Sequence, residues 1–177
     1  MKNLLVTGPP GCGKTTLVRR IVHELGDLTM VGFYTEEIRE GRDRVGFALV
    51  GLDGKKGILS HVRFPGPHRV GKYGVDIMGF ESFLDGIRVG DPGLCLVVID
   101  EIGKMECISA RFRSFLGERL AAPVPLLATI ALRGMTPIEQ VKARPDVRII
   151  TMSVENREER FREVLAGVRR LIGEKKD

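Results

Sequence analysis

The stretch GPPGCGKTT, Gly8–Thr16, decides the fold of this chain. It fits the phosphate-binding pattern Gly-x-x-x-x-Gly-Lys-Ser/Thr in full, with the last three fixed positions at Gly13, Lys14 and Thr15. The glycines let backbone N–H groups converge on phosphate oxygens, and a helix that begins near Lys14 adds its positive end. We expect Lys14 to bind the β- and γ-phosphates and the Thr15 hydroxyl to ligate Mg²⁺.

The flanks of this stretch support the same interpretation. The apolar run Leu4–Val6 precedes it and the amphipathic run Leu17–Val22 follows it, so the order is strand, phosphate loop, helix. The motif requires this context, which a glycine-rich turn without a ligand would not need. The nucleotide-binding candidates in the loop are Gly8, Pro9, Pro10, Gly11, Cys12, Gly13, Lys14, Thr15 and Thr16.

Length and composition predict a single domain over residues 1–177, because 177 residues with 43% hydrophobic and 29% charged content suit one globular unit. The longest apolar stretches, near Leu94–Ile99 and Leu126–Leu132, are too short to span a membrane. The start MKNLLVTG leads directly into a strand and leaves no room for a signal peptide. We therefore expect a cytoplasmic protein without a membrane partner.

Neither the net charge nor the cysteine content assigns a function to the chain. A net charge of +5 admits a nucleic-acid partner, but 28 basic residues are mixed with 23 acidic ones, and two tyrosines offer little base stacking, so we disfavour one. Three cysteines without CxxC spacing indicate neither disulfides nor zinc. Cys12 has two interpretations, an oxidisable thiol near a helix start or a small residue that fills a variable motif position. The sequence does not disclose an oligomeric state.

Strand and helix patterns alternate along the chain, which predicts an α/β fold: a mostly parallel sheet with helices on both faces. The expected strands are Asn3–Thr7, Val31–Ile38, Val45–Leu52, Gly57–Phe64, Leu94–Asp100, Val124–Leu132 and Val147–Met152. The expected helices are Thr15–Leu25, Asp76–Ile87, a helix from about Glu106 to Leu120, Thr136–Ala143 and Asn156–Ile172. Residues 31–64 form a strand-rich antiparallel meander inserted into the parallel plan, Gly66–Gly74 a loop, and Glu174–Asp177 a tail.

Ligands of such sheets bind outside the carboxyl ends of the strands, which gathers distant residues onto one rim. Four hydrophobic residues precede Asp100, which ends the expected strand. This pattern is typical of the second motif of phosphate-loop proteins, whose carboxylate holds the magnesium ion or its water shell. Glu101 follows, and a second carboxylate there suits a general base that activates the water attacking the γ-phosphate. The alternative for Glu101 is a structural acid.

Phosphoryl transfer also needs a cation on the transferred group. The candidates are Lys104, Arg133 and Arg157, each of which could instead be a solvated surface charge. Thr129 either contacts the γ-phosphate or the water, or is a buried strand threonine. The basic loop His68–Tyr73 either covers the nucleotide or a second substrate, or is solvated.

Several stretches resemble the thermophilic-type nucleoside-triphosphatase family, over essentially the whole chain and in order. They are GPPGCGKTT, GFYTEEIR (32–39), VGKYGVD (70–76), VVIDEIGKME (97–106), ATI (128–130) and ENR (155–157). The resemblance implies a P-loop NTPase with a RecA-like fold and Mg²⁺-dependent hydrolysis of ATP, GTP, CTP and UTP to the diphosphate and phosphate. Residue by residue, it gives phosphate binding to Gly8–Thr15, magnesium to Asp100 and the water to Glu101. Lys104, Asn156 and Arg157 belong to matched stretches as catalytic or nucleotide-binding candidates.

Rival functions remain open at this point. A small P-loop kinase would transfer the γ-phosphate to an acceptor instead of water. An AAA-type module would need a helical lid domain, for which the chain ends too soon. A GTP-specific switch would need the guanine-reading pattern Asn/Thr-Lys-x-Asp, which does not occur. Its absence predicts loose base selectivity, with the base near Thr151–Arg157.

Overall fold

The parallel part of the sheet carries the phosphate loop. In the computed structural model, which describes residues 1–173, β1 (Asn3–Thr7) lies between β8 (Leu126–Ile130) and β9 (Val147–Thr151). On the other side of β8, β7 (Leu96–Ile102) pairs with β2 (Met30–Glu40). These neighbours all run parallel. Every residue of β1 and β8 is buried, as expected of strands covered on both faces.

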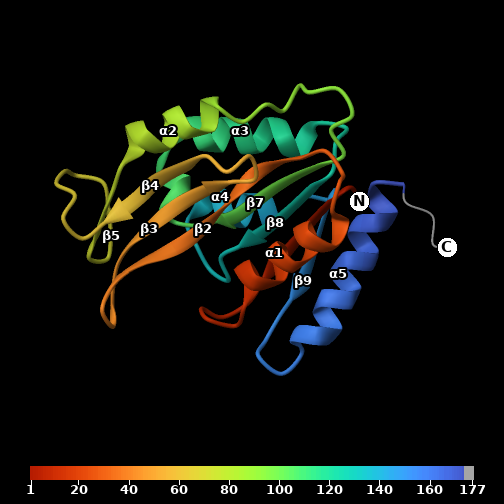
Figure 1. The fold of residues 1–177 in the computed structure, drawn as a ribbon, viewed down its shortest axis with the longest axis horizontal. Helices are drawn as coiled ribbons and strands as arrows, with labels where there is room; N and C mark the ends of the chain where they lie inside the picture. The colour runs from red at the N-terminus through yellow and green to blue at the C-terminus, as the bar shows by residue number, and fades with distance from the viewer. Residues whose placement is uncertain (174–177) are drawn as a thin grey trace.

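Helices cover both faces of this sheet (Figure 1). On one face α1 (Lys14–Leu25) and α5 (Arg157–Leu171) pack their apolar side chains against β1 and β9. On the other lie α2 (Ile77–Asp85), α3 (Ala110–Ala121) and α4 (Thr136–Lys142). The two hydrophobic cores are therefore separated by the sheet, and the predicted α/β fold class is confirmed. Within residues 1–173, none of the helices has the length and apolar character to cross a membrane.

An antiparallel extension continues the sheet beyond β2. Its strands are β3 (Asp43–Gly51), β4 (Lys56–His61), β5 (Arg69–Val70) and β6 (Tyr73–Val75). The extension is longer than predicted, since the stretch 66–74 expected as a loop holds β5 and the start of β6. Ser60 pairs with Val75, and Val75 donates its N–H to the carbonyl of His68, so tertiary pairing forms strands too short to show a pattern. Within the described residues, four strand pairings are parallel and four antiparallel.

The predicted ends of most elements differ from the observed ones by a few residues, and two differences bear on the site: the end of the buried strand that holds Asp100 and the start of the helix after it. β7 does not end at Asp100 but continues to Ile102, which is buried and accepts a hydrogen bond from the N–H of Ala131. The helix expected from Glu106 begins at Ala110, after a short 3₁₀ turn, η1 (Glu106–Ile108). Ser109 separates the two, because its extended backbone lets its hydroxyl accept from the N–H of Phe112 at 3.0 Å and cap α3. The tail expected over Glu174–Asp177 lies outside the described residues.

Gly32 joins the parallel and antiparallel parts of the sheet and allows a stability test. It lies opposite Val98 of β7 with a φ of 130°, and a Cβ there would approach the Val98 carbonyl oxygen to 1.8 Å. We expect Gly32→Ala to lower the free energy of unfolding by about 3 kcal/mol or more in urea titrations, because both backbone strain and a backbone clash result.

Gly54 supplies the matched control. Its φ is also positive, at 84°, but no atom lies within 4 Å of a Cβ built there. Gly54→Ala should cost only about 1 kcal/mol, the strain of the left-handed conformation. Equal losses in the two variants would contradict the role given to the close approach of β2 and β7.

Candidate active site

The phosphate loop runs from the end of β1 to the start of α1, and Lys14 is folded back across it. Its ammonium donates to the carbonyl of Gly8 at 3.1 Å and lies 3.5 Å from that of Pro9. Gly13 precedes the helix with a φ of 101°, a conformation that favours glycine. The first turn of α1 carries no acidic side chain. The loop therefore presents a cation and a helix start to the same place, which suits a phosphate group.

Asp100 ties this loop to the sheet. Its carboxylate is 1% exposed, and it accepts hydrogen bonds from the hydroxyl of Thr15 at 2.8 Å and from that of Thr129. Burial raises the pKa of Asp100 above its usual range, while the two threonine hydroxyls and the charge of Lys14 act in the opposite direction. Thr129 is thus a strand threonine that holds Asp100, from the neighbouring strand β8.

Thr15 and Asp100 together offer a place for a metal ion. Hydroxyl and carboxylate oxygens are the donors that Mg²⁺ prefers. Within residues 1–173 no cluster of three or more His, Cys, Asp or Glu side chains is placed to hold a metal. An ion bound by Thr15 and Asp100 would therefore complete its shell with water and phosphate oxygens, the arrangement common to nucleotide sites.

Glu101 follows Asp100 in β7 and is only partly exposed. The peptide bond between the two residues is cis, and β7 loses its register with β8 between Ile99 and Ile102. Burial raises the pKa of Glu101, the Lys14 charge lowers it and the Asp100 charge raises it. The carboxylate predicted as the general base therefore lies within the electrostatic range of the phosphate-loop lysine.

Glu106 is a third carboxyl group near these two, and the sequence pattern predicts for it only the start of a helix. It is 5% exposed, and burial, with smaller effects of the Glu101 and Asp100 charges, raises the pKa of Glu106 to about 8. A Cβ on Gly103 would lie 2.7 Å from Glu106 Oε2 and 3.6 Å from Glu101 Cγ. The only sequence signal is its place in the stretch IDEIGKME, whose other two acids were assigned.

The loop before α5 reaches the phosphate loop, as predicted. Arg157 donates to the carbonyls of Cys12 at 2.7 Å and Gly11 at 3.1 Å, so its guanidinium binds the loop backbone. Asn156 accepts from the N–H of Ser153 at 2.7 Å and so orders its own loop. A hollow of about 200 Å³ lies beside these residues, lined by Gly11, Gly13, Thr16, Leu17, Arg20, Met152, Arg157, Glu158 and Phe161.

Lys104 and Arg133 lie together elsewhere, where both line a separate hollow beyond the ends of β7 and β8. Of the three cations predicted from the sequence, Arg157 is therefore the one hydrogen-bonded to the phosphate loop.

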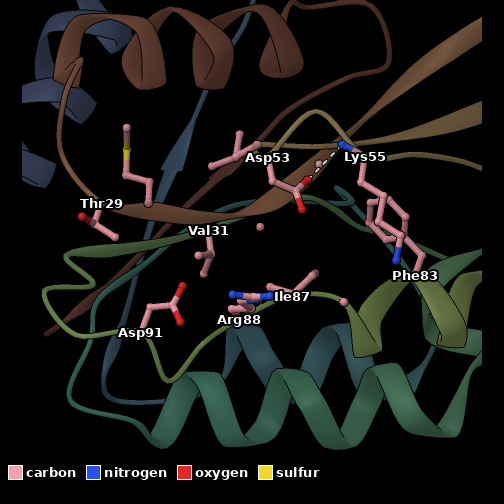
Figure 2. A pocket seen from close by; sticks show the side chains of 13 residues that line it. Thr29, Val31, Asp53, Lys55, Phe83, Ile87, Arg88 and Asp91 are labelled. Carbon is pink, nitrogen blue, oxygen red and sulfur yellow. Dashed lines mark hydrogen bonds between the residues drawn. The ribbon is translucent and has the colours of Figure 1, made fainter.

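Another hollow lies at the opposite end of the strands. Figure 2 shows this space, of about 410 Å³, with Val31, Phe83 and Ile87 as apolar walls and charged side chains around them. It is formed by the start of β2 and the segment before β7, away from the carboxyl ends of the parallel strands. Sheets of this kind bind nucleotide at the carboxyl ends, so we place no part of the nucleotide site here.

A complete phosphate loop between a buried strand and a helix, with a buried aspartate on a nearby parallel strand, defines a P-loop nucleotide-binding protein. The sequence model of the NTPase family matches residues 3–165. The nucleoside-triphosphatase THEP1 of Thermotoga maritima is 38% identical over 97% of this chain and 98% of its own. The human cancer-related nucleoside-triphosphatase is 39% identical over 88% of this chain and 90% of its own.

Solved structures agree. The crystal structure of THEP1 from Aquifex aeolicus matches with a TM-score of 0.81 and 34% identity, covering 94% of this chain and 98% of that one. The solution structure of the human protein matches with a TM-score of 0.78 and 35% identity, covering 96% and 98%. The chain belongs to the NTPase family, and its fold is the P-loop fold, as the resemblance in sequence predicted.

Glu106 should make the stability of the ligand-free protein depend on pH. Its pKa in the folded state, about 8, lies above the ordinary value of 4.5, so folding is favoured most when the group is protonated. The free energy of unfolding should therefore fall as pH rises from about 4.5 to about 8, by an amount on the order of 4 kcal/mol.

Glu106→Gln should flatten this decline, because the amide cannot ionise, and chemical denaturation at several pH values without nucleotide or metal measures it. Glu24→Gln, at an exposed position near the end of α1, is the control and should keep the wild-type slope. Parallel curves for wild type and Glu106→Gln would show that Glu106 is not the group that titrates.

Proposed function

We propose that this protein hydrolyses nucleoside triphosphates to the diphosphate and inorganic phosphate with the help of Mg²⁺. The observation that carries the proposal is the grouping of Lys14, Asp100 and Glu101 around one phosphate loop. The names of the relatives, nucleoside-triphosphatases, support the same reaction. We also keep the expectation of a cytoplasmic location, which rests on the sequence alone.

In the proposed reaction each group has one task. Lys14 leaves the carbonyls of Gly8 and Pro9 and binds the β- and γ-phosphates. Thr15 and Asp100 hold Mg²⁺, which neutralises charge on the phosphate oxygens when it is bound. Glu101 accepts a proton from the attacking water as the bond to the γ-phosphorus forms and the bond to the bridging oxygen breaks. Its raised pKa brings this base closer to neutral pH, which favours proton transfer.

Arg157 is the proposed cation for the transition state. Arg157 is already at the loop, and a rotation away from the carbonyls of Gly11 and Cys12 would free its guanidinium for phosphate oxygens. Lys104 lines the separate hollow with Arg133, and its catalytic role stays a prediction from the sequence that we do not include in the proposed reaction. Asn156 then serves the nucleotide site by holding the loop from which Arg157 projects.

Loose base selectivity follows from the hollow beside the loop. Leu17, Met152 and Phe161 give it apolar walls, and Arg20 stacks over Phe161 at 4.0 Å from the ring centroid. Apolar and stacking contacts accept any base, since every base has an aromatic face. We therefore propose that ATP, GTP, CTP and UTP are all substrates, with the base placed in this hollow.

Glu101→Gln should bind Mg²⁺ and nucleotide as the wild type does but lower kcat by about 100-fold or more, because it removes the base and keeps the shape. Steady-state phosphate release and titration with a fluorescent ATP analogue measure the two properties. Lys14→Ala should instead lose nucleotide binding as well as turnover. Glu24→Gln is the control for an exposed carboxylate, and an unchanged kcat in Glu101→Gln would reject the general-base role.

Phosphate release from the four ribonucleoside triphosphates, with and without Mg²⁺ and with no acceptor present, tests the proposed function itself. We expect kcat/KM values for the four to agree within about tenfold and release to require the metal. Negligible release of phosphate in the presence of Mg²⁺ would reject the hydrolase assignment and favour a kinase. Turnover of GTP alone would contradict the base tolerance and leave hydrolysis standing.

A further inference from the structure

Three basic side chains meet around one hollow on the rim of the sheet. The hollow has a volume of about 510 Å³, and Arg69 of β5, Lys104 after β7 and Arg133 after β8 line it. Its apolar lining comes from Val70, Ile108 and Met135. These segments are far apart in the sequence, so only the fold brings the charges together.

The charges around this hollow are not neutralised by the protein. No acidic residue lines it. Many other arginines of this chain do have carboxylate partners, as in Arg19 with Glu36 and Arg148 with Glu163. By contrast, the side chains of Lys104 and Arg133 form no ion pair or hydrogen bond with any residue in 1–173. Lys104 and Arg133 are exposed, so their donors are available to an anion in the hollow.

Arg69 has a different task in the same hollow. Its guanidinium donates to the carbonyls of Phe64 at 3.1 Å and Lys72 at 2.6 Å, which fixes the β5–β6 turn over the rim. Lys104 and Arg133, whose side-chain N–H groups have no partner in residues 1–173, therefore line the same hollow as a turn that hydrogen bonds hold in shape. This turn keeps an apolar surface, that of Val70, next to them.

The hollow lies on the catalytic side of the sheet but apart from the phosphate loop. Lys104 and Arg133 follow β7 and β8, whose ends pair at Ile102 and Ile130. Ile108 packs against the core beneath α2, α3 and α4, whereas α1 packs on the other face. No residue of the phosphate loop lines the hollow, so a ligand bound there would not compete for the loop.

We propose that this hollow is a second ligand site, which binds a small organic phosphate at the same time as the nucleotide. The phosphate group meets Lys104 and Arg133, and an apolar or aromatic body rests on Val70, Ile108 and Met135. A volume of about 510 Å³ suits one small molecule. A nucleic acid would need a longer basic track with stacking side chains, and the chain has two tyrosines and no tryptophan. The proposal stands whether or not the chain hydrolyses nucleotides.

Binding of 1-naphthyl phosphate, a fluorescent phosphate with an aromatic body, tests the site. The full chain is first saturated with Mg²⁺ and a non-hydrolysable ATP analogue, so that the phosphate loop is filled. We expect saturable binding of one equivalent that 1-naphthol, which lacks the phosphate, does not reproduce. Binding of the probe to the ligand-free chain but not to the chain saturated with the analogue would place the probe in the nucleotide site and overturn the proposal.

Variants then locate the probe. Lys104→Ser with Arg133→Ser should weaken binding by at least tenfold, since two charged contacts are lost. The swap Lys104→Arg with Arg133→Lys should stay within about threefold of wild type, because both charges remain. Far-UV circular dichroism reports whether each variant is folded, and Arg133→Ser alone serves if the double variant is not.

The charge-matched control is Arg42→Ser with Lys56→Ser, which removes two exposed cations of the antiparallel extension. It should change the affinity less than twofold. Equal weakening by the control would show a general effect of net charge and reject the site. A single-stranded oligonucleotide that displaces the probe and binds more tightly than it does, with the same dependence on Lys104 and Arg133, would also overturn the proposal in favour of a nucleic-acid surface.

Discussion

The carboxylate of Asp100 is the group on which the site depends. It is buried, and both of its oxygens accept hydrogen bonds, one from Thr15 at the start of α1 and one from Thr129 in β8. A buried carboxylate is stable only when such partners compensate for lost hydration. The same contacts therefore hold the phosphate loop and two neighbouring strands in one arrangement, so that the oxygens of Thr15 and Asp100, the proposed metal ligands, are held close together.

Charged side chains around Asp100 shift one another's pKa values. Glu101 and Glu106 share with Asp100 a buried region in which each carboxylate raises the pKa of the next, and Lys14 partly offsets this. Carboxylates held this close together lower the stability of the folded protein, but they suit proton transfer and metal binding. Arg157 adds a cation, and its guanidinium donates hydrogen bonds to carbonyls of the phosphate loop. A bound phosphate can replace these carbonyls as the acceptor.

Much of the fold was predictable because its signals are local. The apolar runs of β1 and β8 and the amphipathic runs of α1 and α5 show patterns that identify the element from the local sequence alone. The misses have one cause. β5 and β6 contain two and three residues and form strands by pairing with each other and, for β6, with β4. Likewise, the break at Ser109 depends on a single side-chain hydrogen bond, which a hydrophobic pattern does not reveal.

The sequence by itself determined the phosphate-loop motif, the acidic pair Asp100–Glu101 of a buried strand and the family to which the chain belongs, because each is carried by short stretches of contiguous residues. Only the tertiary structure decided which distant groups act together. In the folded protein Thr129 donates a hydrogen bond to Asp100, and Arg157 donates to the loop carbonyls. Glu106 is buried beside the acidic pair, and Lys104 and Arg133 line one hollow. The physical reason is that parallel strands bring their carboxyl ends to one rim, where hydrogen bonding and burial are set by packing between segments far apart in the chain.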